Sequence, residues 1–188
     1  AWTALPGQGL AVNQGPGSLT RSIDGGLVVA AEAPLLQDLA VGDRDGVRLA
    51  HLDLDGVMQE RGRILLDSVS SDPEETVGLT ELLALDGPRA LLALTRRHRP
   101  RQWTARLQLF SWPARLSQLA LQPITGWDVT SKDLPRENWE GLAWGPDLDD
   151  GRRTLLIVSD DNFSLIQRNL VGVLAPRRSP RCRSLPEN

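Results

Sequence analysis

Acidic side chains stand at the beginning or the end of several apolar segments of this chain. Glu81 and Glu140 begin two such segments, whereas Glu32 and the pair Asp160 and Asp161 follow others directly. Carboxylates that converge in space can bind Ca²⁺, a hard cation that takes about six to eight oxygen ligands. Such an ion can orient and neutralise a phosphate group. The alternative is a structural role, in which these acids hold the strands beside them through hydrogen bonds to the backbone.

Basic side chains follow one of the matching segments. Arg96, Arg97 and Arg99, together with His98, follow the apolar residues 91–94 after Thr95. Cations beside acids at one rim suit an anionic, phosphate-like ligand, because guanidinium groups bind phosphate oxygens with paired hydrogen bonds. The alternative is a solvated loop rich in arginine.

Three Asp-Gly pairs divide the chain at nearly even intervals, and an apolar, β-prone run follows each pair. The pairs are Asp24-Gly25, Asp86-Gly87 and Asp150-Gly151. A strand, an Asp-Gly turn and a second strand form a strong hairpin signal. We therefore expect these aspartates to serve turns. Their recurrence at a fixed period predicts a repeat architecture.

Short apolar or alternating segments between turn residues predict an all-β fold. Strands are expected at residues 19–23, 27–31, 47–54, 63–68, 79–85, 89–96, 105–110, 116–124, 139–144, 154–159 and 165–174. Four antiparallel strands per repeat are typical of a β-propeller blade, and propellers use about four to eight blades. Three blades are too few for a ring, so the sequence predicts half of a six-bladed propeller. A twisted open sheet or a sandwich with repeated hairpins is the alternative.

Composition and charge argue against several classes of protein. The net charge is -3, and residues 176–188 carry four Arg and one Glu, which leaves -6 on residues 1–175. An acidic body argues against nucleic acid as the main partner, since phosphate backbones need a basic surface. No run approaches the roughly 18 apolar residues of a membrane span, and the N-terminus shows no signal-peptide pattern. The single cysteine, Cys182, excludes an intrachain disulfide.

Three stretches resemble one bacterial family, the phytase-like proteins, which are described as having esterase-like activity of phytase. The first runs from Asn138 to Phe163 and contains Asn-Trp-Glu-Gly-Leu-Ala-Trp-Gly-Pro and Val-Ser-Asp-Asp-Asn-Phe. Residues 78–85, with Glu81, and residues 27–38, with Glu32, resemble two earlier blocks. The resemblance implies a β-propeller, an acidic active region and a location in the periplasm or outside the cell.

The same resemblance, carried over by position, implies roles for particular acids. Glu81, Glu140, Asp160 and Asp161 would be catalytic, with the two aspartates as metal ligands or general base. Glu32, Glu81, Glu140 and Asp160 would bind Ca²⁺. The expected function is metal-assisted hydrolysis of a phosphoric ester, with a small anionic substrate and water as nucleophile. The alternatives are a non-catalytic propeller that acts as a binding module and a truncated, inactive fragment.

The expected organisation has three parts. Residues 1–17 form an N-terminal loop or frayed strand, residues 18–175 form a partial phytase-like propeller domain, and residues 176–188 form a disordered basic tail. The sequence alone leaves the oligomeric state open.

Overall fold

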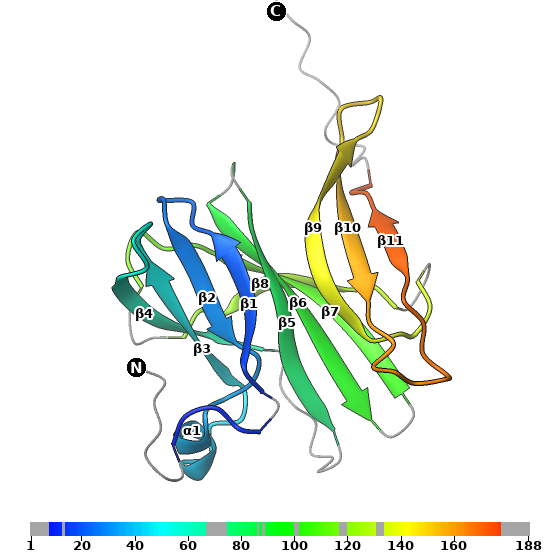
Figure 1. Ribbon diagram of the computed structural model, residues 1–188. Coiled ribbons are helices and arrows are strands. Elements are labelled where there is room, and N and C mark those ends of the chain that lie inside the picture. Colours follow the sequence, from blue (N-terminus) through cyan, green and yellow to red (C-terminus); the bar gives the residue numbers. More distant parts are fainter. Residues whose placement is uncertain are drawn as a thin grey trace, which may run out of the picture.

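A computed structural model describes residues 8–12, 14–66, 75–85, 87, 89–99, 102–116, 120–130 and 134–177 of the chain. The described residues form an all-β protein with three antiparallel sheets and one short helix (Figure 1). Asp86 and most of the basic tail, including Cys182, lie outside the described residues, so the predictions made for them stay predictions.

Each sheet is built from strands that follow one another along the chain. The first sheet contains β1 (Pro16–Arg21), β2 (Leu27–Ala31), β3 (Gly46–Leu52) and β4 (Met58–Leu65). The second contains β5 (Thr76–Leu85), β6 (Ala90–Arg99), β7 (Gln102–Ser111) and β8 (Pro123–Asp128). The third contains β9 (Trp139–Asp147), β10 (Arg153–Ser159) and β11 (Val171–Leu174). In every sheet the neighbours in sequence are also neighbours in space, as expected for consecutive hairpins.

Two of the predicted Asp-Gly turns are confirmed where the structure describes them. Gly25 and Gly26 have φ values of 92° and 79° between β1 and β2, and Gly151 has a φ of 78° between β9 and β10. Glycine adopts these left-handed conformations without the steric cost that other residues meet. The Asp150 carboxylate also accepts the backbone N–H of Arg152 at 3.2 Å, which supports its expected turn role.

Several predicted boundaries were wrong. The segment at 98–104, expected to connect two strands, is mostly strand itself, because β6 extends to Arg99 and β7 begins at Gln102. The last strand of the second sheet lies at Pro123–Asp128 rather than at 116–124; proline donates no hydrogen bond, which suits the start of this edge strand. The strand expected over 165–174 is only β11, and the helix α1 (Leu36–Ala40) was not predicted.

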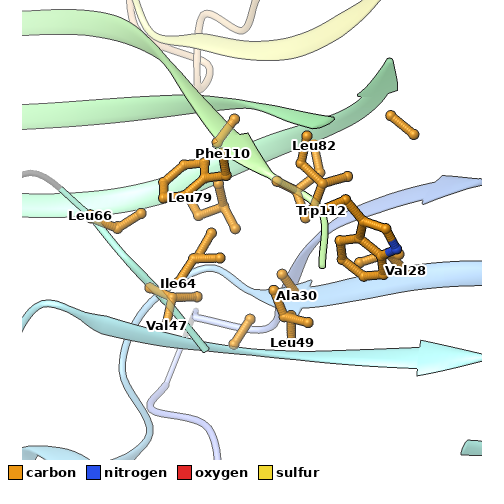
Figure 2. Close-up of a cluster of buried hydrophobic side chains, with 14 of the residues drawn as sticks. Val28, Ala30, Val47, Leu49, Ile64, Leu66, Leu79, Leu82, Phe110 and Trp112 are labelled. Carbon is orange, nitrogen blue, oxygen red and sulfur yellow. The ribbon is translucent and has the colours of Figure 1, made fainter. Parts of the chain in front are cut away.

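Two apolar cores hold the sheets together. Figure 2 shows the first core, where Val28, Leu49 and Ile64 of the first sheet pack against Leu82 and Phe110 of the second. The second core lies between the second and third sheets. It is built around the buried residues Leu92, Leu94, Ala105, Leu107, Trp139, Leu142 and Ile157. Within the described residues, the second sheet is therefore covered on both faces, and the first and third sheets each pack against it with one face.

The first strands of the three sheets come together. β1 lies beside β5, and β5 contacts β9 (Figure 1). The Ala84 N–H donates to the Thr20 hydroxyl at 3.1 Å, and the Thr80 hydroxyl donates to the Trp139 carbonyl at 3.4 Å. Residues far apart in sequence meet along this line of strands.

Candidate functional site

Glu32 reaches the second sheet because the chain is held tightly at the end of β2. Its backbone N–H donates to the Gly15 carbonyl at 3.0 Å, and its carbonyl accepts the Leu79 N–H at 2.7 Å. A Cβ at position 17 would lie 2.5 Å from the Leu79 carbonyl oxygen and 3.0 Å from the Glu32 Cα. Glycine at this position therefore permits the close approach that places Glu32 beside β5.

Arg96 of β6 lies at the centre of the site. Its Nη2 donates to Glu32 Oε1 at 2.8 Å, and its Nη1 donates to Asn138 Oδ1 at 2.6 Å and to Glu140 Oε1. The guanidinium carbon also lies 5.1 Å from the ring centre of Trp103, within the range of a cation–π interaction. We call Glu32, Arg96, Asn138 and Glu140 the arginine–carboxylate cluster. Its members lie in strands of the second and third sheets or directly beside strands of the first and third, since Glu32 follows β2 and Asn138 precedes β9.

Asn138 orients Glu140 within the cluster. Its side-chain nitrogen donates to Glu140 Oε1 at 2.8 Å, while its side-chain oxygen accepts from Arg96. Asn138 is fully buried, so each of these hydrogen bonds is shielded from water. Among the described residues, Glu140 Oε2 has no hydrogen-bond partner and remains available to a bound molecule.

The Arg96 guanidinium faces the carboxylates of both Glu32 and Glu140, and both neighbours affect the pKa of Glu32. Burial raises the pKa of the Glu32 carboxyl; Arg96 opposes the rise, and the nearby Glu140 carboxylate adds to it. A carboxyl with a raised pKa holds its proton at a higher pH than an exposed glutamate does. The cluster thus combines a cation that can bind an anion with an acid that can donate a proton.

Glu81 is not a member of this cluster. The sequence pattern makes Glu81 the counterpart of Glu140. In the sheets, however, Glu81 lies opposite Leu94 and Gly141 lies opposite Val158, the matching position of the third sheet. The counterpart of Glu81 is therefore Gly141. The Glu81 carboxylate accepts the Leu82 N–H at 3.0 Å. Burial raises its pKa, and backbone hydrogen bonds oppose the rise. Glu81 therefore does not occupy the register position of Glu140, and among the described residues no hydrogen bond or ion pair joins its side chain to the cluster.

Asp160 and Asp161 differ from each other in their surroundings. The Asp160 N–H donates to the Asn138 carbonyl at 3.0 Å, so the Asp160 backbone adjoins the cluster while its side chain is exposed. The Asp161 carboxylate accepts the Phe163 N–H at 2.9 Å and the Asn169 side-chain N–H at 3.0 Å. Asp161 thus orders the connection between β10 and β11.

The arginine-rich segment divides between the two faces of β6. Arg96 points to the cluster, whereas Arg97 and Arg99 form ion pairs with the buried Glu75 at 3.0 and 3.1 Å. Successive side chains of a strand point to opposite faces, which explains the division. A pocket of about 130 Å³ lies beside Arg97, lined also by Arg106 and Asp128. The interpretation of this segment as a solvated loop is wrong.

Sequence reasoning missed Asn138 as a member of the site, and it named Arg96 only as one of a basic group. The available signal was the spacing: Glu32, Arg96 and Asp160 follow their apolar runs at equal intervals along the chain. That pattern places opposite charges at matching strand ends. It could have identified Arg96 as the partner of the acids.

The described residues do not assemble a metal site. Among them, no three His, Cys, Asp or Glu side chains are grouped so that they could hold a metal ion. Glu32 and Glu140 both bind Arg96, whose guanidinium supplies the positive charge between them. Calcium binding by Glu32, Glu81, Glu140 and Asp160 stays a prediction.

The fold and the site together define an all-β protein of three hairpin-built sheets with an arginine–carboxylate cluster where they meet. Residues 2–163 match the family model for phytase-like proteins, described as "esterase-like activity of phytase". The chain therefore belongs to the phytase-like family. No curated protein and no solved structure matches it. Among the described residues, no helix is long and apolar enough to cross a membrane.

Proposed function

We propose that this chain is a phytase-like protein that binds a phosphoric ester at the arginine–carboxylate cluster and hydrolyses it. The observation that carries the proposal is the convergence of Arg96, Glu32 and Glu140 from three different sheets. Arg96 would exchange its hydrogen bond to one of the two carboxylates for hydrogen bonds to phosphate oxygens of the ligand. Family membership supports the reaction class.

The cluster supplies the remaining groups for hydrolysis by water. Glu140, through its available Oε2, would take a proton as water attacks phosphorus. As the new bond to phosphorus forms, the bond to the leaving oxygen breaks, and Glu32 would give that oxygen a proton. The raised pKa of Glu32 suits a proton donor. Asp160, whose backbone adjoins Asn138, is the second candidate for the base.

The proposed architecture is a β-propeller in which each sheet is a repeated blade. It is supported by the consecutive strand order in every sheet and by the neighbouring first strands β1, β5 and β9. First strands of propeller blades line the central channel. The cluster would then lie at the channel. We also propose a periplasmic or extracellular location, which cell fractionation with an antibody to the chain would test.

The test is hydrolysis of inositol hexakisphosphate and of a chromogenic phosphate monoester by the full chain, with Ca²⁺ and with EGTA. The variants are Glu140→Gln, Glu32→Gln and Asp160→Asn, and the matched control is Glu60→Gln in the first sheet. We expect Glu140→Gln and Glu32→Gln each to lose at least about tenfold in kcat, and Glu60→Gln to keep the wild-type rate. No phosphate release by the wild type, with or without Ca²⁺, would refute the hydrolase, and equal rates in the wild type and Glu140→Gln would refute the role given to Glu140.

A second candidate function is binding without catalysis. It is favoured by the fact that Arg96 already donates to Glu32, Asn138 and Glu140, as a structural clamp would. Calorimetry with inositol hexakisphosphate separates the two. Binding that is lost in Arg96→Met, with no phosphate released by the wild type, would establish the binding module.

A further inference from the structure

The pocket of about 130 Å³ beside Arg97 lies on the face of the second sheet that also carries the first core, since Thr95 in its lining pairs with Leu79 of that core. Cross-strand partners point to the same face of a sheet, so the register places six lining residues in two neighbouring rows. The rows are Val77, Arg97 and Thr104, and then Thr95, Arg106 and Asp128. Arg96 points to the opposite face, so the pocket is separate from the arginine–carboxylate cluster.

The two arginines of the pocket are each positioned by a neighbour. Arg97 Nε lies 3.0 Å from Oε1 of Glu75, whose side chain is fully buried. Gly126 of β8 leaves room for the guanidinium of Arg106: a Cβ at position 126 would lie 2.8 Å from its Nε and 3.1 Å from its Nη2. Groups that are positioned before a ligand arrives lose less conformational entropy when they bind it.

The chemistry of the pocket favours an oxyanion. The lining and its ion pairs contain three arginines, Arg97, Arg99 and Arg106, and two carboxylates, Glu75 and Asp128. A guanidinium has five N–H donors in a planar fork, so Arg97 can hold Glu75 and also donate to the oxygens of an anion. The hydroxyl of Thr104 is a further donor in the same row. The excess of positive charge and the set of donors therefore suit a small anion rich in oxygen.

Asp128 determines which oxyanion fits. Its Oδ1 accepts the N–H of Thr130 at 2.9 Å and the Thr130 hydroxyl at 3.0 Å, which hold the carboxylate at the pocket. An ionised carboxylate only accepts hydrogen bonds, at about four positions. Inorganic phosphate keeps a P–O–H group near neutral pH and can donate to Asp128. Sulfate has only acceptor oxygens, which the carboxylate would repel.

We propose that this pocket binds inorganic phosphate, with Arg97, Arg106 and Thr104 donating to its oxygens and Asp128 accepting its P–O–H group. The site is additional to the arginine–carboxylate cluster and does not depend on catalysis. Phosphate binding at this pocket without ester hydrolysis would leave the proposal standing and refute the hydrolase. Ester hydrolysis by a chain that binds no phosphate here would do the reverse.

The test is isothermal titration calorimetry of the full chain with inorganic phosphate and with sulfate, near neutral pH and in EGTA. We expect phosphate to bind at least about tenfold more tightly than sulfate. Arg106→Met should weaken phosphate binding at least about tenfold, because a charge-assisted donor is lost. Gly126→Ala should weaken it as well, since the added methyl group displaces the same guanidinium without removing it. Asp128→Asn should abolish the preference for phosphate over sulfate.

The matched control is Arg61→Met, at an exposed arginine of β4, which should bind phosphate as the wild type does. Arg97 is kept in every variant, because its loss would weaken the pairing of the buried Glu75 and mix an effect on folding with one on binding. Far-ultraviolet circular dichroism checks that each variant is folded.

A wild type that binds no phosphate would overturn the proposal, and so would equal affinities of the wild type for phosphate and sulfate. Phosphate binding that Arg96→Met abolishes and Arg106→Met preserves would place the anion at the arginine–carboxylate cluster and also overturn it.

Discussion

Removing the charge of Arg96 tests the electrostatic balance of the cluster most directly. Arg96→Met keeps much of the apolar stem but leaves the Glu32 and Glu140 carboxylates facing each other without a cation. Breaking a fully buried ion pair costs about 3–5 kcal/mol, whereas an exposed pair contributes about 0–1 kcal/mol. The side chains of Arg96, Glu32 and Glu140 are 19%, 19% and 36% exposed. We therefore expect a loss of about 2 kcal/mol in the free energy of unfolding.

The assay is equilibrium unfolding in urea, followed by tryptophan fluorescence at about pH 7 and about pH 4. The loss should shrink at the lower pH, because burial raises the pKa of Glu32 and protonation of Glu32 removes its repulsion with Glu140. Adding Glu140→Gln to Arg96→Met should recover part of the stability at pH 7, because one of the two facing charges is gone.

Arg61→Met is the matched control for this prediction. Arg61 is exposed on β4, and its guanidinium contacts the sulfur of Met58. A surface change of this kind should stay within about 0.5 kcal/mol of wild type. If Arg96→Met were as stable as Arg61→Met at pH 7, the cluster would not couple the three sheets and the argument would fail.

Three further predictions concern single residues. Glu81→Gln should raise the melting temperature at pH 7 and change it little at about pH 4. Burial raises the pKa of Glu81 in the folded state, so the charged carboxylate destabilises the protein above that pKa, and this destabilisation disappears below the pKa of the unfolded state. A lower melting temperature of the variant at pH 7 would contradict this. Gln108→Leu should stabilise by about 1 kcal/mol in urea unfolding, since both amide atoms are buried without partners among the described residues, and a loss of stability would argue against it. Gly17→Ala should cost about 1–3 kcal/mol in the same assay, because its Cβ would press on the Leu79 carbonyl; an unchanged midpoint would show that the strands separate easily.

Local patterns were sufficient to predict most strands. Leu27–Ala31, for example, is an apolar run after an Asp-Gly turn, and β2 occupies those residues. The connection before β11 could not be predicted in this way. There, Arg168 pairs with the buried Glu137 at 2.7 Å, and the Ser159 hydroxyl accepts the Leu170 N–H at 3.0 Å. These contacts join side chains to residues distant in the sequence, so they produce no periodic pattern of apolar and polar residues from which the connection could be predicted.

The candidate site was predicted in part. Glu32 and Glu140 were expected to converge, and the structure brings them to Arg96. The spacing along the chain assigns Glu81 to the position of Glu140, whereas the strand pairing places Glu81 one residue further along, opposite Leu94 as Gly141 lies opposite Val158. A shift of one residue in a strand turns a side chain to the other face. Spacing in the sequence could not reveal that shift.

The sequence by itself determined the all-β class, the hairpin turns at Asp-Gly and the membership of the phytase-like family, because each depends on local residue types and their order. Only the tertiary structure decided which acids share a site. Arg96 selects Glu32 and Glu140 because strands from three sheets meet there, and burial raises the pKa of Glu32 in that place. Electrostatic partners depend on distances in space, which the order of residues does not contain.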